Sequence, residues 1–112
     1  MSFVVNETSF EREVLGYSRP VLVHFWTPWC GICHLISPML ETMQKGSSKP
    51  IKLVSINADE NFKLANTYRL RNLPTIMLFK NGQLVEKIDN INNRDSLKTA
   101  LERLMNNTLS LS

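Results

Sequence analysis

The sequence predicts an α/β protein with a central mixed β-sheet that is flanked by helices on both faces. Apolar runs of strand length alternate with segments of helical periodicity, a pattern typical of parallel strands joined by helices. Late in the chain, two strand-like runs flank Asn81-Gly82, a strong hairpin signal, so part of the sheet is expected to be antiparallel. The length of 112 residues fits a single domain spanning residues 1–112.

The first third of the chain predicts two strands with a helix between them. Residues 3–5 predict a short strand, and a capping box of Thr8 and Glu11 predicts a helix that continues to about Leu15. The run Val21–Trp26 is apolar on both faces and predicts a central buried strand. A second helix is predicted by a series of apolar residues at helical spacing: Ile32, Leu35, Ile36, Met39, Leu40 and Met43.

The rest of the chain predicts three strands and two helices. Residues 51–57 predict a buried strand, after which Asp59 is expected to cap a short helix. Residues 75–79 and Gln83–Ile88 form the predicted hairpin, and a last helix starts near Asn93. The apolar positions of the two helices are Phe62, Ala65 and Tyr68 in the first, and Leu97, Ala100, Leu101, Leu104 and Met105 in the second.

Composition argues against several classes of partner. The formal net charge of +3 arises from 13 Lys and Arg against 10 Asp and Glu, and these residues are scattered along the chain, which disfavours nucleic acid binding. No apolar run reaches membrane-spanning length, and the N-terminus does not resemble a secretory signal. We therefore expect no membrane partner and a location in the cytoplasm or an equivalent reducing compartment.

The only two cysteines, Cys30 and Cys33, are separated by two residues. A disulfide that closes so short a loop adds little stability, which suggests a chemical purpose. The pair follows a predicted strand and begins a predicted helix, where free N–H groups and the helix dipole favour the nucleophilic thiolate of Cys30. Cys33 is one helical turn further on and can resolve a mixed disulfide formed at Cys30.

Other interpretations of the pair are weaker. Two inert buried cysteines would not need this placement, and a zinc site normally needs four ligands, whereas no second such pair exists. The only histidines are His24 and His34, and His34 directly follows Cys33, an awkward arrangement for a tetrahedral site. We predict no metal and no cofactor besides the disulfide itself. A zinc ion or iron–sulfur cluster shared by two chains through these cysteines is a remaining alternative.

Residues 26–33, which read Trp-Thr-Pro-Trp-Cys-Gly-Ile-Cys, resemble the active-site segment of thioredoxins. Further matches cover almost the whole chain: Pro38, Leu73-Pro74-Thr75 and Phe79-Lys80-Asn81-Gly82. The resemblance implies the thioredoxin fold and a protein-disulfide reductase. It also implies disulfide-containing target proteins and an upstream reductase as partners, and we expect a monomer.

The resemblance further assigns residues to a docking surface around the cysteines. Pro74 is expected to follow a cis peptide bond, and the backbone of Leu73 to pair with an extended segment of the substrate. Trp29 is expected to be partly exposed on this surface, whereas Trp26 is expected to be buried. The set is completed by Gly31, Ile32 and Thr75. The plainer alternatives are a strand-entry proline at position 74 and a packed core tryptophan at position 29.

Four positions depart from the usual thioredoxin pattern. Ile32 replaces a proline, which predicts a shifted reduction potential; a more oxidising pair is one direction of this shift, and the sequence leaves the sign open. His24 stands where an aspartate assists the second cysteine; it is either a proton acceptor for Cys33 or a neutral core residue. Ser55 replaces a lysine that often pairs with that aspartate, and Asn90 replaces a glycine of the docking surface, which could hinder the usual partners.

Two alternative functions follow from these departures. The first is an isomerase or oxidant that uses the same cysteines at a less reducing potential. The second is a non-catalytic module that binds partners through the surface around Trp29 and Pro74. The presence of both cysteines argues against the second alternative, since a binding module needs neither.

Overall fold

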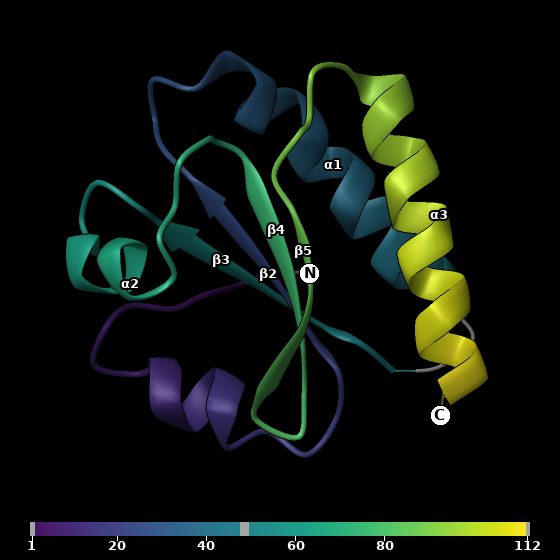
Figure 1. Ribbon diagram of the computed structural model, residues 1–112, viewed down its shortest axis with the longest axis horizontal. Helices are drawn as coiled ribbons and strands as arrows, with labels where there is room; N and C mark the ends of the chain where they lie inside the picture. Colours follow the sequence, from purple (N-terminus) through teal and green to yellow (C-terminus); the bar gives the residue numbers. More distant parts are fainter. Residues whose placement is uncertain (1, 48–49, 112) are drawn as a thin grey trace.

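Five strands and four helices make up the part of the chain that the computed structural model describes, residues 2–47 and 50–111, with side chains described up to residue 106 (Figure 1). In chain order they are β1 (Ser2–Val4), a short π-helix η1 (Glu11–Leu15), β2 (Val21–Trp26), α1 (Gly31–Gly46), β3 (Lys52–Asn57), α2 (Phe62–Thr67), β4 (Thr75–Lys80), β5 (Gln83–Ile88) and α3 (Arg94–Leu111). None of the described helices is long and apolar enough to cross a membrane.

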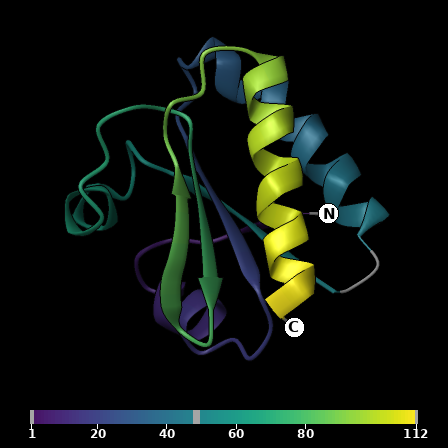
Figure 2. The ribbon, with the colours of Figure 1, turned by 45° about the vertical axis from the view of Figure 1, so that its right-hand side comes forward.

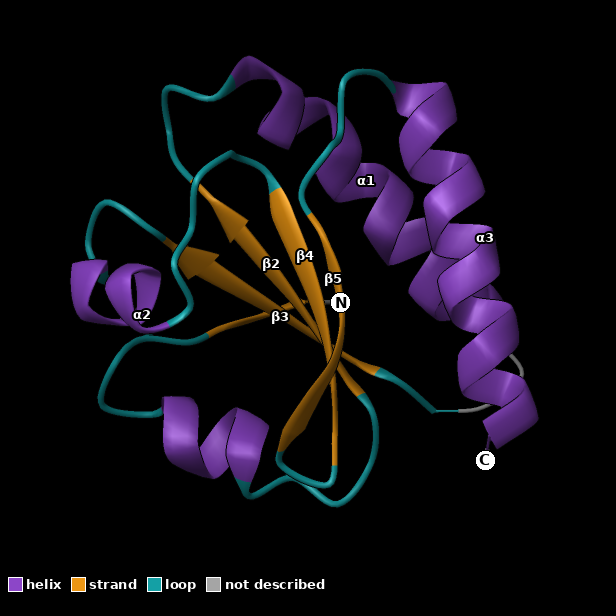
Figure 3. Ribbon diagram, viewed as in Figure 1, coloured by secondary structure: helices purple, strands orange, loops and turns teal. Residues whose placement is uncertain are grey.

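The strands form one mixed sheet in the order β1-β3-β2-β4-β5, drawn in orange in Figure 3. β1 and β2 run parallel to β3, whereas β4 is antiparallel to β2 and to β5, so the predicted mixture of parallel and antiparallel pairing is confirmed. The register places Asn57 of β3 opposite Trp26, and Thr75 of β4 opposite Phe25. The loops that follow β2 and β3 and the loop that precedes β4 therefore meet at one end of the sheet.

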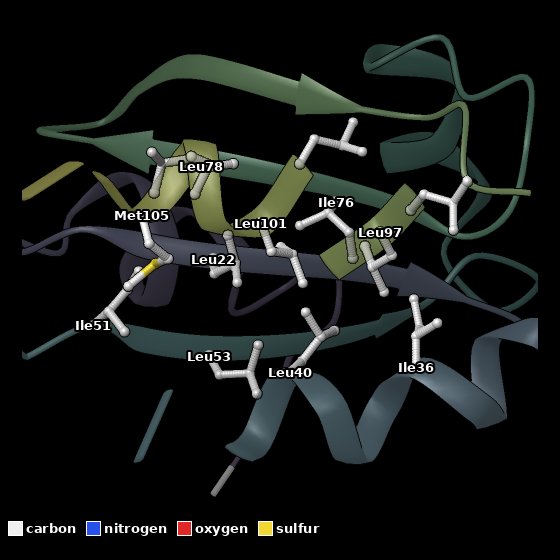
Figure 4. Close-up of a cluster of buried hydrophobic side chains, with 13 residues drawn as sticks. Leu22, Ile36, Leu40, Ile51, Leu53, Ile76, Leu78, Leu97, Leu101 and Met105 are labelled. Carbon is white, nitrogen blue, oxygen red and sulfur yellow. The ribbon is translucent and has the colours of Figure 1, made fainter. Parts of the chain in front are cut away.

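Helices cover both faces of the sheet, as predicted (Figures 1 and 2). α1 and α3 cover one face, and the core beneath them contains only aliphatic side chains and one methionine, many of which are drawn in Figure 4. Its members are Leu22, Ile36, Leu40, Ile51, Leu53, Ile76, Leu78, Ile88, Ile91, Leu97, Leu101, Leu104 and Met105.

The opposite face, under η1 and α2, has a core of mainly aliphatic side chains that also contains Phe10, Phe25 and Phe79, and it is called the aromatic core below. The rings of Phe10 and Tyr68 each approach that of Phe79 edge-on, with centroids 5.9 and 5.7 Å apart. Strand alternation explains the division, because successive residues of β2 point to opposite faces: Leu22 joins the aliphatic core and Phe25 the aromatic one.

Lys52 is buried at the edge of the aromatic core. Its ammonium donates to the backbone carbonyl of Glu13 at 2.9 Å and to the carboxylate of the same residue at 2.7 Å. It also lies over the rings of Tyr17 and Phe3, 4.2 and 5.4 Å from the centroids. These contacts connect the end of η1 to β3.

The predicted helix starts were wrong in two places. The capping box of Thr8 and Glu11 does not form, because the side chain of Asn6 accepts the backbone N–H groups of Thr8 and Ser9 in a preceding turn, and the helix begins only at Glu11. Asp59 does not cap α2, which begins after Asn61 without a side-chain capping bond. The other predicted strands and helices are present, and their bounds agree with the predicted ones to within one residue.

Candidate active site

The two cysteines are joined in a disulfide at the N-terminus of α1. Cys30 is the N-cap residue, and the backbone N–H of Cys33 donates to its sulfur at 3.3 Å. The helix starts here because the β2 strand ends at Trp26 and a turn over Pro28 reverses the chain, with the N–H of Cys30 donating to the carbonyl of Thr27. A negative charge on the Cys30 sulfur would therefore face the N–H donors and the positive dipole end of a 16-residue helix.

The two tryptophans flanking the turn differ in exposure. Trp29 is 70% exposed, and its indole N–H donates to the carboxylate of Asp59 at 2.8 Å, which holds the ring against the loop after β3. Trp26 was predicted to be buried and this was wrong: it is half-buried. It is the last residue of β2, and its ring meets that of His34 edge-on at 6.0 Å where the sheet ends.

The Leu73–Pro74 peptide bond is cis, as predicted, and Pro74 is buried directly before β4. Thr75 is fully buried, and its hydroxyl donates to the carbonyl of Asn72 at 2.6 Å. Leu73 is half-buried. Since Thr75 pairs with Phe25, this segment lies at the same end of the sheet as the turn that carries the cysteines.

His24 lies on the sheet face that α1 covers and is only 4% exposed. Its cross-strand neighbours are Ser55, which is half-buried, and Ile76. Its Nε2 atom has no hydrogen-bond partner among the described residues. Burial, followed by the proximity of His34, lowers the pKa of His24 from the ordinary 6.5 to about 4, so the ring is neutral near pH 7.

His34 forms a hydrogen bond that the sequence did not predict. The residue is exposed on α1, and its Nε2 lies 2.9 Å from the carbonyl oxygen of Pro28. Because a carbonyl can only accept, the ring must donate through Nε2. The bond ties the first turn of α1 to the turn before it. The only available signal was that His34 follows Cys33, and the spacing alone does not indicate a partner six residues earlier.

The remaining predicted site residues lie on or near α1. Gly31 is exposed, and a Cβ atom added to it would meet nothing within 4 Å, so this position is not sterically restricted to glycine. Ile32 is half-buried, and Asn90 is exposed beyond the end of β5. Within residues 2–47 and 50–111, no group of three or more His, Cys, Asp or Glu side chains is arranged to hold a metal ion.

Comparison with known proteins agrees with this geometry. The family model described as Thioredoxin matches residues 1–103. The chain is 38% identical to Thioredoxin 1 of Synechococcus elongatus over 99 residues. These residues make up 88% of this chain and 92% of that protein. It is 37% identical to the thioredoxin of Synechocystis over 101 residues, which are 90% of this chain and 94% of that protein. It is also 40% identical to the chloroplastic M-type thioredoxin of Pisum sativum over 85 residues, which are 76% of this chain and 49% of that protein.

Three findings together identify the family of the chain: a cysteine pair joined at the start of a helix, a cis proline at the same end of the sheet, and these similarities. It belongs to the thioredoxin family and is a thiol–disulfide oxidoreductase that reduces disulfides in proteins.

Proposed function

We propose that Cys30 is the attacking nucleophile and Cys33 the resolving thiol of this reductase. The observation that carries the assignment is the position of Cys30 as N-cap of α1, where its sulfur accepts the N–H of Cys33. The helix N-terminus favours a thiolate at Cys30. Cys33 is almost fully buried, which suits a thiol that reacts only with Cys30.

The proposed reaction moves two electrons from the dithiol to the target. The Cys30 thiolate attacks one sulfur of a target disulfide, the target S–S bond breaks, and its other sulfur leaves as a thiolate that takes up a proton. Cys33 then loses its proton and attacks the sulfur of Cys30, which releases the second target thiol. The product is the Cys30–Cys33 disulfide, and an upstream reductase returns two electrons and two protons.

His24 is our candidate for the proton acceptor of Cys33. Support comes from its place on the face covered by α1 and from its unpartnered Nε2. A base with a pKa of about 4 releases its proton again quickly near pH 7, so this role would be a relay and not a store. The alternative, a neutral core histidine without a catalytic role, predicts no effect of its replacement on the rate.

We further propose that the target docks on Trp29, Ile32, Leu73, Pro74 and Thr75, with Gly31 leaving the approach to Cys30 open. The exposed ring of Trp29 and the position of residues 73–75 at the same end of the sheet support this surface. We also propose a single domain over 1–112 that acts as a monomer in a reducing compartment such as the cytoplasm, where a reductant for the disulfide is present.

The test of the cysteine assignment uses two variants. Cys30→Ser is expected to abolish reduction of a protein disulfide. Cys33→Ser is expected to accumulate mixed disulfides with the target, visible as a shift in mass that excess dithiothreitol removes. Normal turnover by the Cys30→Ser protein would refute the assignment.

The reduction potential separates the reductase from the isomerase or oxidant alternative, which Ile32 between the cysteines favours. A midpoint near about −270 mV, the value of thioredoxin, supports a general reductase, and one near about −200 mV or above supports an isomerase or oxidant. No reversible two-electron transition would instead favour a binding module or a shared metal.

A further inference from the structure

The hydrogen bond between His34 and Pro28 brackets the cysteine pair, because Pro28 precedes Cys30 and His34 follows Cys33. We propose that His34 is a positioning residue, whose bond holds Cys30 at the N-terminus of α1 while the disulfide is open. This inference rests on the proposed function, because it takes Cys30 to be the attacking nucleophile. It adds to that function a role for a side chain outside the cysteine pair and the docking surface.

The turn that leads into Cys30 is exposed at its centre. Its two central residues are Pro28 and Trp29, and it is closed by the N–H of Cys30, which donates to the carbonyl of Thr27 at 3.2 Å. Proline has no N–H, so the carbonyl is the one backbone group through which Pro28 can form a hydrogen bond. The Nε2 atom of His34 lies 2.9 Å from this oxygen, an ordinary length for an N–H···O bond. His34 therefore supplies the partner that connects this turn to α1.

The ring of His34 is well placed to transmit the rigidity of α1 to this turn. α1 is anchored on the sheet by Ile36 and Leu40, whose side chains are almost completely buried. The ring is connected to this helix by only two rotatable bonds, and its second contact, edge-on to the ring of Trp26 at 6.0 Å, limits them further. Ordering a histidine therefore costs less conformational entropy than ordering a lysine or an arginine for the same bond.

The bond matters most when the disulfide is open. In the disulfide form, the covalent link to Cys33 already holds Cys30. In the dithiol form this link is gone, and the position of Cys30 depends on the hydrogen bonds of the turn on one side and of the helix on the other. The sulfur of Cys30 accepts the N–H of Cys33 at 3.3 Å, and the effect of the helix dipole falls off within the first turn. A turn that moves away from α1 would therefore raise the pKa of the Cys30 thiol and lower the fraction of reactive thiolate.

The test measures the reactivity of Cys30 in the dithiol form of the protein. Alkylation by iodoacetamide is followed against pH, and mass spectrometry identifies the labelled cysteine. His34→Leu removes the donor and is expected to raise the pH midpoint of Cys30 alkylation by about 0.5, roughly a threefold change in the thiol–thiolate equilibrium, which is the effect of a weak net hydrogen bond. His34→Gln keeps a donor without a charge and should return most of the way to the wild-type midpoint. Thr42→Leu, which replaces another exposed polar residue of α1, should leave the midpoint unchanged.

Two results would overturn the inference. One is a wild-type midpoint in His34→Leu. The other is an equal rise in His34→Leu and His34→Gln, because it would show that the charge of the imidazole, and not its hydrogen bond, affects Cys30. Thermal unfolding of the dithiol forms confirms that the variants are folded at the assay temperature.

The identity of the labelled residue separates this inference from the proposed function. If alkylation of the wild-type protein takes place first at Cys33, the proposed function fails. If it takes place at Cys30 with one midpoint in all variants, the proposed function stands and only the positioning role of His34 fails.

Discussion

Two basic side chains are buried on opposite faces of the sheet, and they differ in how their polar atoms are paired. Lys52, at the edge of the aromatic core, has a carbonyl and a carboxylate of Glu13 within 2.9 Å and two aromatic rings over its ammonium. His24, on the face covered by α1, has no hydrogen-bond partner for Nε2 among the described residues.

The comparison separates two uses of buried polar groups. A charged ammonium can be buried only when partners replace its lost hydration, and Lys52 has them, which indicates a structural role. The unpartnered Nε2 atom of His24 offers the fold no comparable gain. The imidazole of His24 is tolerated because burial keeps it neutral. Three predictions test this contrast, from the largest expected change in stability to the smallest, and a fourth concerns the exposed His34.

Acidification is expected to have the largest effect. The unfolded chain protonates His24 below about pH 6.5, whereas the folded protein does so only near pH 4, because its pKa is lowered. The free energy of unfolding should therefore fall as the pH drops from about 6.5 to 4, by about 3 kcal/mol. Urea unfolding of the wild-type protein and of His24→Leu at pH 7 and pH 4 measures this. Carboxylates such as Glu13 titrate in both proteins, so their contributions cancel in the comparison. An equal decrease in the free energy of unfolding of the two proteins would contradict the prediction.

Replacing Lys52 is expected to have the next largest effect. Lys52→Ala removes the buried stem and its ring contacts, and should lower the free energy of unfolding by about 2 kcal/mol. The expected loss of stability is smaller than that for a fully buried ion pair, because a third of the Glu13 side chain is exposed. Lys52→Met, which retains the stem, should lose less. Reduction of a protein disulfide per folded molecule should be unchanged, and a loss of activity would assign Lys52 to the chemistry.

Replacing His24 is expected to have the opposite effects: stability should stay nearly unchanged, whereas the reaction should slow. His24→Leu removes an unpartnered polar atom from the core, so the free energy of unfolding at pH 7 should stay within about 1 kcal/mol of the wild-type value or rise. If His24 accepts the proton of Cys33, release of target from the mixed disulfide should slow about tenfold. Stopped-flow release of a labelled target gives this rate. An unchanged rate would make His24 a neutral core residue.

The bond from His34 to Pro28 should give the smallest effect on stability. His34→Leu removes the donor to the carbonyl of Pro28 and should lower the free energy of unfolding by about 1 kcal/mol or less, since the residue is exposed. His34→Gln retains a donor and is expected to restore part of the loss. Thermal unfolding of the oxidised proteins compares them, and identical midpoints for all three would show that this bond adds nothing.

Most of the fold could be predicted because long apolar runs and the hairpin signal depend on local sequence. The errors concern side chains whose partners come from elsewhere. Asp59 looked like a helix cap, but its carboxylate accepts the indole N–H of Trp29, 30 residues away. Thr8 looked like a helix cap, but it belongs to a preceding turn, in which its backbone N–H donates to the side chain of Asn6.

In the site, the motif located the cysteines and the cis proline, whereas contacts across elements could not be read from spacing. Trp26 is the last residue of β2 and is only half-buried at the end of the sheet, which an apolar run does not reveal. His34 gains its partner through the turn between β2 and α1.

The disulfide encloses only Gly31 and Ile32, so the sheet and nearly all of every helix lie outside the loop that opens and closes in each cycle. Folding and oxidation form a closed thermodynamic cycle. The difference in free energy of unfolding between the disulfide and dithiol forms therefore equals the difference in redox free energy between the folded and the unfolded chain. For two electrons, about 1.4 kcal/mol corresponds to about 30 mV. Two unfolding curves, one for each form, thus measure in millivolts how strongly the fold favours one redox state over the other.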